Sequence, residues 1–165
     1  MKRIAILLLL TSFSLNLYAQ VQKKRFSFGY SGGGTTSTEN ATLGIDYRYN
    51  LTNTIRLSPS VTKMLRYYGY TGWMFDANVH YVVAFNDVFS IYPLAGFSAL
   101  SLRNKVKNEK EKAPRDTYFG ANVGVGGEFY FVDEIIIGLD VKYNIQKKHD
   151  QMMAAIRIAY MFQSP

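Results

Sequence analysis

The feature that most constrains the fold is an alternation of apolar and polar residues that recurs along most of the chain. In residues 43–51, Leu, Ile or Tyr stands at every odd position and Gly, Asp, Arg or Asn at every even one. Because successive side chains of a β-strand point to opposite faces, such a segment has one apolar and one polar face. Six other segments share this period: 25–30, 55–62, 73–85, 119–131, 137–145 and 152–162. The pattern predicts an all-β chain.

An eighth strand is expected over residues 89–102, although both of its faces look apolar and its facing stays open. The connectors between the eight strands alternate in length. Those at 52–53, 86–88 and 132–134 are tight, whereas those at 31–40, 68–71, 103–116 and 146–150 are mostly longer and more polar. This asymmetry is typical of outer-membrane barrels, which have short periplasmic turns and longer external loops. With eight strands, both ends of the chain fall on the periplasmic side.

An amphipathic sheet can close with its apolar face inward, as in a soluble lipocalin-like barrel, or outward, as in a membrane barrel. Three features favour the outward choice. Fifteen aromatic side chains on the apolar face would overfill a narrow interior. The polar face carries both signs of charge, as a buried network requires. The polar face is also rich in glycine, which leaves room for long side chains inside: Gly29, Gly44, Gly120, Gly124, Gly126 and Gly138.

We therefore predict an eight-stranded antiparallel up-and-down transmembrane β-barrel with a polar network in its lumen. The expected members of this network are Asp46, Arg48, Arg56, Asp76, His80, Glu128, Asp140, Lys142 and Arg157. The chain has no cysteine, so an exported domain of this size needs another source of stability. A closed barrel supplies one, because it pairs every backbone group within the membrane.

The N-terminus has the layout of a secretory signal peptide. Lys2 and Arg3 precede an apolar run over residues 4–10, and Ala19 provides a small residue for cleavage near Gln20. The apolar run is too short to span a bilayer as a helix. We therefore expect residues 1–19 to be a cleaved signal and residues 20–165 to be the barrel domain, exported to a bacterial outer membrane.

The layout of residues 25–162, the Tyr18-Ala19-Gln20 signal end and the alternating last strand, residues 156–162, resemble a known family. They are similar to the small Bacteroidetes-type outer-membrane β-barrel proteins, with the layout of OmpX/OmpA-like eight-stranded barrels. The resemblance implies that the outer-membrane assembly machinery reads the aromatic last strand. Phe162 is followed by three more residues, so this match to the assembly signal is approximate.

The sequence offers little chemistry. There are two histidines, His80 and His149, and no metal-ligand spacing, so we expect no metal, cofactor or catalytic residue. The connector at 103–116 is predicted to be an external basic loop. It is either a solvated hairpin tip or a surface that meets lipopolysaccharide, rather than nucleic acid, by charge attraction. Its basic residues are Arg103, Lys105, Lys107, Lys110, Lys112 and Arg115.

These features favour a non-enzymatic, monomeric outer-membrane protein with a filled polar lumen and a structural or surface-interaction role. Three alternatives remain open at this point: a small ion or solute channel, a lipid-modifying outer-membrane enzyme, and a soluble lipocalin-like barrel. Eight strands leave little lumen once Arg, Glu and Tyr side chains occupy it, which disfavours the channel.

Overall fold

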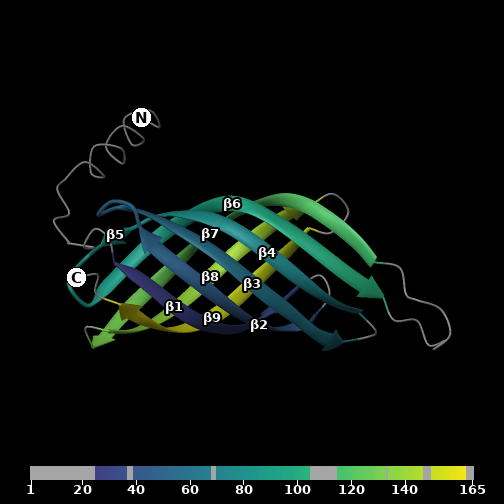
Figure 1. Ribbon diagram of the computed structural model, residues 1–165, viewed down its shortest axis with the longest axis horizontal. Helices are drawn as coiled ribbons and strands as arrows, with labels where there is room; N and C mark the ends of the chain where they lie inside the picture. Colours follow the sequence, from purple (N-terminus) through teal and green to yellow (C-terminus); the bar gives the residue numbers. More distant parts are fainter. Residues whose placement is uncertain are drawn as a thin grey trace, which may run out of the picture.

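The computed structural model describes residues 25–36, 39–67, 70–104, 115–132, 134–146 and 150–162. These residues form nine strands of one antiparallel sheet (Figure 1). The strands are β1 (Phe26–Thr35), β2 (Ala41–Asn50), β3 (Ile55–Tyr67), β4 (Tyr70–Tyr81), β5 (Val83–Ala84), β6 (Phe89–Asn104), β7 (Arg115–Val132), β8 (Ile135–Gln146) and β9 (Gln151–Phe162). β5 continues β4 beyond Val82, and both pair with β6, so the two act as one strand of an eight-stranded wall.

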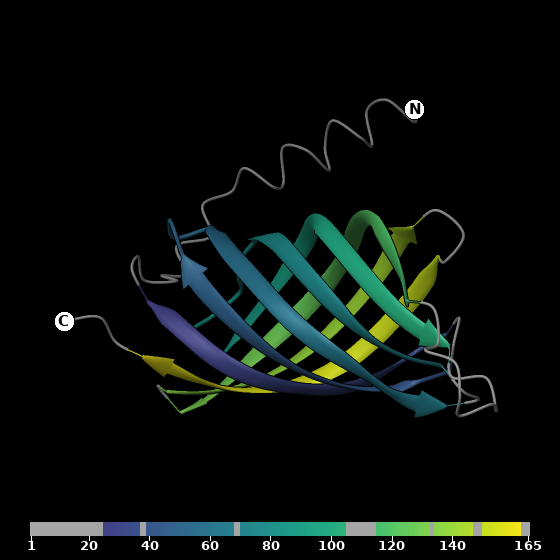
Figure 2. The ribbon, with the colours of Figure 1, turned by 45° about the vertical axis from the view of Figure 1, so that its right-hand side comes forward.

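The sheet closes on itself. Each strand pairs with its neighbours in sequence, and the pairing of β1 with β9 joins the two ends of the wall (Figure 2). Closure gives each long strand a partner on both sides, as a spanning sheet requires. The predicted eight-stranded antiparallel up-and-down barrel is confirmed. Within the described ranges, no helix is long and apolar enough to span a membrane.

The apolar side chains face out of the barrel. In β9, buried and exposed side chains alternate from Gln151 to Phe162. Arg157 is 0% exposed, whereas its neighbours Ile156 and Ile158 are 60% and 59% exposed. A soluble lipocalin-like barrel would show the reverse, so that alternative is wrong. The facing of residues 89–102 is also settled, because Tyr92 is buried while Phe97 is 78% exposed.

The two ends of the barrel differ less in connector length than the sequence predicts. We call the end with the connectors 51–54, 85–88 and 133–134 the turn end, and the opposite end the loop end. Residues 31–35, predicted as loop, are strand, because residues 31–34 pair with both β2 and β9 and Thr35 pairs with β9. Tyr67 pairs with Tyr70, which shortens the predicted connector 68–71 to residues 68–69. Only the connector 105–114 is long.

The lumen contains three layers of side chains. A polar layer crosses its middle, between an apolar layer towards each end. The loop-end layer comprises Met64, Met74, Leu100, Leu102, Met153 and Ala155. Towards the turn end lie two separate apolar clusters, which we call together the turn-end layer: Val82, Ala84, Leu94 and the ring of Tyr92 in one, and Ile136, Ala159 and Met161 in the other. The alternation predicted glycine and polar or charged side chains inside, so both apolar layers were missed.

Candidate functional site

The candidate site is the polar layer of the lumen, which we call the polar belt. It contains the nine predicted network residues together with Tyr92, and all of their side chains point inward. The members come from β2, β3, β4, β6, β7, β8 and β9, and Ser27 adds a hydroxyl from β1. Every strand of the eight-stranded wall therefore contributes a side chain to the belt.

Glu128 on β7 lies at the centre of the belt and is fully buried. Arg48 Nη1 donates to Glu128 Oε1 at 2.5 Å, and Arg56 Nη1 donates to Oε2 at 2.7 Å. Arg157 Nη1 lies 3.5 Å from Oε1 and makes a third ion pair. One carboxylate thus joins three guanidinium groups from β2, β3 and β9.

Arg48 extends the network to the other side of the lumen. Its Nη2 donates to Asp140 Oδ2 at 2.6 Å and its Nε donates to Asp46 at 3.2 Å. Asp46 also accepts from Arg157 Nε at 2.8 Å. Charged donors and acceptors of this kind make the strong hydrogen bonds that offset the cost of burying ions.

Tyr92 is the member of the belt that the sequence did not reveal. Its ring stacks on His80 with centroids 4.5 Å apart, and the guanidinium groups of Arg48 and Arg56 lie 5.2 and 4.8 Å from its centroid. Its hydroxyl accepts from Arg48 at 2.7 Å and donates to Asp140. Cations over an aromatic ring are attracted by its quadrupole. Ser90 and Ser98 lie on the same face of β6 as Tyr92. These two polar residues were the only indication in the sequence that this face points into the lumen.

A second group of contacts lies beside the central one. Lys142 on β8 pairs with Asp76 on β4, and Asn122 on β7 donates to Asp76 at 3.1 Å and to Asn78 at 2.9 Å. Asn144 in turn donates to Asn122. The predicted network therefore forms two clusters rather than one, and asparagine amides, which the prediction omitted, complete the second.

Glycines make room for the belt at two close approaches. A Cβ at Gly29 would lie 2.7 Å from Arg157 Nε, and one at Gly126 would collide with the Tyr92 ring and the Asp140 carboxylate. Both glycines belong to the set that the sequence analysis placed on the inner face. Their missing side chains let large polar groups cross a narrow lumen.

The formal charge of the belt is balanced. Four cations, Arg48, Arg56, Lys142 and Arg157, face four carboxylates, Asp46, Asp76, Glu128 and Asp140. A buried charge without a partner is expensive, and equal numbers give every cation of the belt a carboxylate as counter-charge. The belt therefore carries no net charge that would attract ions of one sign.

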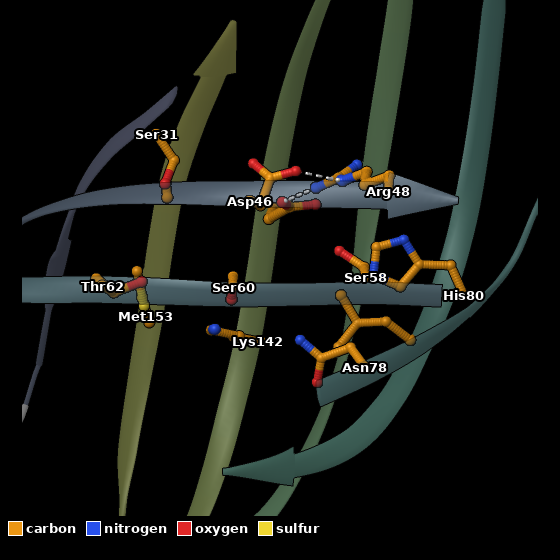
Figure 3. Close-up of a pocket in the computed structure, with 13 residues that line it drawn as sticks. Ser31, Asp46, Arg48, Ser58, Ser60, Thr62, Asn78, His80, Lys142 and Met153 are labelled. Atoms are coloured by element: carbon orange, nitrogen blue, oxygen red, sulfur yellow. Dashed lines mark hydrogen bonds and ion pairs between the residues drawn. The ribbon is translucent and has the colours of Figure 1, made fainter. Parts of the chain in front are cut away.

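A small cavity lies beside the belt (Figure 3). Its lining includes the hydroxyls of Ser58, Ser60 and Thr62 on β3 and the charged side chains of Asp140 and Lys142 on β8. It offers about 40 Å³ for the centres of water molecules, and one buried water needs roughly 10–15 Å³ on that measure. The cavity has room for a few waters next to the ion pairs.

The predicted basic loop falls mostly outside the described residues. Arg103 is exposed near the end of β6, and Arg115 pairs with it through the backbone of β7. The segment 105–114, which is not described, contains the other four basic residues, Lys105, Lys107, Lys110 and Lys112. All residues of the polar belt lie in the described ranges. Among the residues that are described, no three His, Asp or Glu side chains are grouped to hold a metal ion.

The outer membrane protein β-barrel domain family matches this chain over residues 5–162. The chain belongs to that family. It is therefore an outer-membrane barrel protein, as its outward apolar face and closed sheet indicate. Comparison of the sequence with curated proteins gave no match.

Three solved barrels illustrate the shared fold. The N-terminal barrel of Pseudomonas aeruginosa OprF is 17% identical, with a TM-score of 0.72 over 85% of this chain and 98% of that one. Ail of Yersinia pestis is 15% identical, with a TM-score of 0.60 over 86% and 100%. Neisserial surface protein A is 12% identical, with a TM-score of 0.65 over 85% and 96%. At such identities the likeness concerns the fold alone.

As in other outer-membrane barrels, the outward face of this family member carries aromatic residues near a membrane boundary. At the turn end, Phe26 of β1 stacks on Phe162 of β9 at 5.0 Å, and Tyr160 meets Phe162 edge-on at 4.8 Å. These rings lie where the first and last strands join. They thus reinforce the seam that closes the barrel.

Proposed function

We propose that the protein is a closed, non-conducting outer-membrane barrel with a structural and surface-interaction role. The observation that carries the proposal is the filling of the lumen. The polar belt occupies its middle, and the side chains of Met64, Met74 and Ile136 in the two apolar layers are each 0% exposed. A solute would have to displace both apolar layers and break paired charges in order to cross.

The loop end is proposed to face the cell exterior and to contact polyanions, lipopolysaccharide first among them. Its connectors and adjoining strand ends carry Lys63, Arg66, Arg103, Lys105, Lys107, Lys110, Lys112, Arg115, Lys147 and Lys148 against Glu39, Glu109, Glu111, Asp116 and Asp150. The belt is neutral, and the three basic residues 23–25 equal in number the acidic residues Asp87, Asp133 and Glu134. The excess positive charge beyond the predicted signal therefore belongs to the loop end, where it attracts phosphates.

One fold relative supports a polyanion as the partner class. Ail of Yersinia pestis has been crystallised in complex with the heparin analogue sucrose octasulfate. We extend to this chain only the chemistry of that ligand, a dense cluster of anionic groups. Phosphates of lipopolysaccharide present the same chemistry at an outer-membrane surface, and no nucleic acid needs to be invoked.

Export and assembly follow from the two ends of the chain. We propose that residues 1–19 are removed as a signal peptide and that β9, with outward Ile158, Tyr160 and Phe162, is read by the assembly machinery. The proposal treats the barrel as a monomer without enzymatic activity. The signal end at Tyr18-Ala19-Gln20 favours a Bacteroidetes-type origin.

Conductance of the refolded protein in planar lipid bilayers tests the closed lumen. The expected result is a current no larger than that of the protein-free bilayer, with heat-modifiable gel mobility of the same sample as proof of folding. Steady single-channel steps from folded protein would overturn the proposal in favour of a small channel. In that case the cavity beside Asp140 and Lys142 would mark part of the pore.

A further inference from the structure

Polar side chains reach the outward face of the barrel near the loop end on β3, β6 and β7. Lys63 on β3 pairs with Trp73 on β4, Trp73 with Ser101 on β6, and Ser101 with Thr117 on β7. These four residues form one paired row across β3, β4, β6 and β7, and the row continues to Leu43 on β2. The next row towards the turn end, Val61, Phe75, Ala99 and Phe119, is entirely apolar.

Lys63 is the unusual member of this row. Its ammonium lies 4.5 Å from the centroid of the Trp73 ring, on the face of the wall that meets lipid. An ammonium there is tolerated only where polar headgroups begin, and Trp is enriched at the same depth. The pair therefore marks the level at which hydrocarbon gives way to headgroups on this side of the barrel.

Nothing in the described part of the protein neutralises Lys63. The ion pairs found there all belong to the polar belt, and the outward neighbours of Lys63 across β2 and β4 are Leu43 and Trp73. A lysine at a membrane boundary whose charge is not met by a carboxylate is suited to a lipid phosphate. The flat Trp73 ring would hold the ammonium at a fixed height for that contact.

We propose that Lys63 and Trp73 form a binding site for a phosphate of lipid A on the outer wall of the barrel. The choice of lipid A rests on the proposed function, which places the loop end in the outer leaflet. The site is separate from the basic loop at 103–116, because its two residues lie in the transmembrane wall. The exposed Arg103 stands one row further out, where it adds to the positive field around the phosphate.

The chain supplies its own reporter, because Trp73 is its only tryptophan. Full-length protein refolded in detergent is titrated with diphosphoryl lipid A, and the midpoint is read from the emission of Trp73. Parallel titrations use dephosphorylated lipid A and phosphatidylglycerol. Diphosphoryl lipid A should shift the emission at the lowest concentration, and the dephosphorylated form should require far more.

Two substitutions separate charge from shape at the site. Lys63→Gln should weaken the response to diphosphoryl lipid A roughly fivefold, the effect of one basic residue at a membrane surface. Lys63→Arg keeps the cation and should bind within about twofold of the wild type, since Arg also packs over aromatic rings. Midpoints are compared rather than intensities, because the ammonium itself perturbs the Trp73 emission. Heat-modifiable mobility verifies that each variant is folded.

Equal midpoints for the wild type and Lys63→Gln would overturn the site. An equal response to phosphatidylglycerol and lipid A would overturn the assignment to lipid A. Neither result bears on the lumen, whose closure is decided by conductance alone. Failure of this inference is therefore distinguishable from failure of the proposed function.

Discussion

Replacing Glu128 by Gln removes the carboxylate at the centre of the polar belt while nearly preserving its shape. Of the three arginines around it, Arg48 keeps Asp46 and Asp140, and Arg157 keeps Asp46. Among the described residues, Arg56 has no ion pair besides Glu128. The variant thus leaves one fully buried guanidinium without a counter-charge. Removing one partner of a buried pair costs about 3–5 kcal/mol, and we expect a loss of unfolding free energy in that range.

The assay is urea unfolding in lipid vesicles, followed by Trp73 emission and by heat-modifiable gel mobility. A second variant sharpens the test: Arg56→Met combined with Glu128→Gln removes the stranded cation along with the anion. Because the two residues share an ion pair, the double variant should be more stable than Glu128→Gln alone. Asp87→Asn, which neutralises an exposed turn carboxylate, serves as the control and should stay within about 0.5 kcal/mol of the wild type.

Two results would refute this reasoning. The first is a Glu128→Gln protein within about 0.5 kcal/mol of the wild type, since that is the range of ordinary surface substitutions. The second is a double variant less stable than Glu128→Gln, because it would mean that Arg56 is not the group left without a partner.

Three further predictions concern the facing and filling of the wall. Val123→Arg, which places a cation on the lipid-facing side near the middle of β7, should lower the unfolding free energy by about 2–4 kcal/mol in vesicles. Gly126→Ala should cost about 1–3 kcal/mol by forcing a methyl group into the Tyr92 ring, whereas Gly127→Ala, whose Cβ has only ordinary contacts, should cost less than 1 kcal/mol in the same urea assay. Met74→Ala should cost about 2–5 kcal/mol by leaving a cavity in the loop-end layer. It should still show no conductance, because the polar belt remains in place.

The alternating pattern predicts the fold and the facing of seven strands because both depend on one local property. A shift of one residue in the register of a strand would move every one of its side chains to the other face of the sheet. The pattern therefore separates Arg157 from Ile156 and Ile158 without any knowledge of their neighbours. It is uninformative over residues 89–102, where both faces are apolar, and so it misses Tyr92.

The contacts of the belt depend on properties that lie beyond the local pattern. Arg48 and Glu128 stand 80 positions apart, and only the register of the closed sheet places them at one height. The apolar layers were missed for a related reason. Lumen residues such as Met74 and Ile136 look like ordinary breaks in the alternation, and their common role appears only when the strands are aligned around the barrel.

The glycines of residues 32–34 show a third limit. Their composition is typical of a loop, yet pairing with strands on both sides makes them part of β1. A Cβ at Gly33 would meet the Ala154 carbonyl of β9, so the small residue there reflects close strand approach rather than a flexible connector. Pairing at the junction of β1 and β9 therefore outweighs the low strand propensity of these glycines.

The central claim is that apolar side chains meet lipid while the charged ones fill the lumen, and adjacent isoleucines on β8 test it most directly. Ile136 is 0% exposed in the turn-end layer, whereas Ile137 is 41% exposed on the outer wall. Methyl-labelled protein in lipid nanodiscs should give nuclear Overhauser contacts between acyl-chain protons and Ile137 but none to Ile136. Contacts from the acyl chains to Ile136, with none to Ile137, would contradict the account.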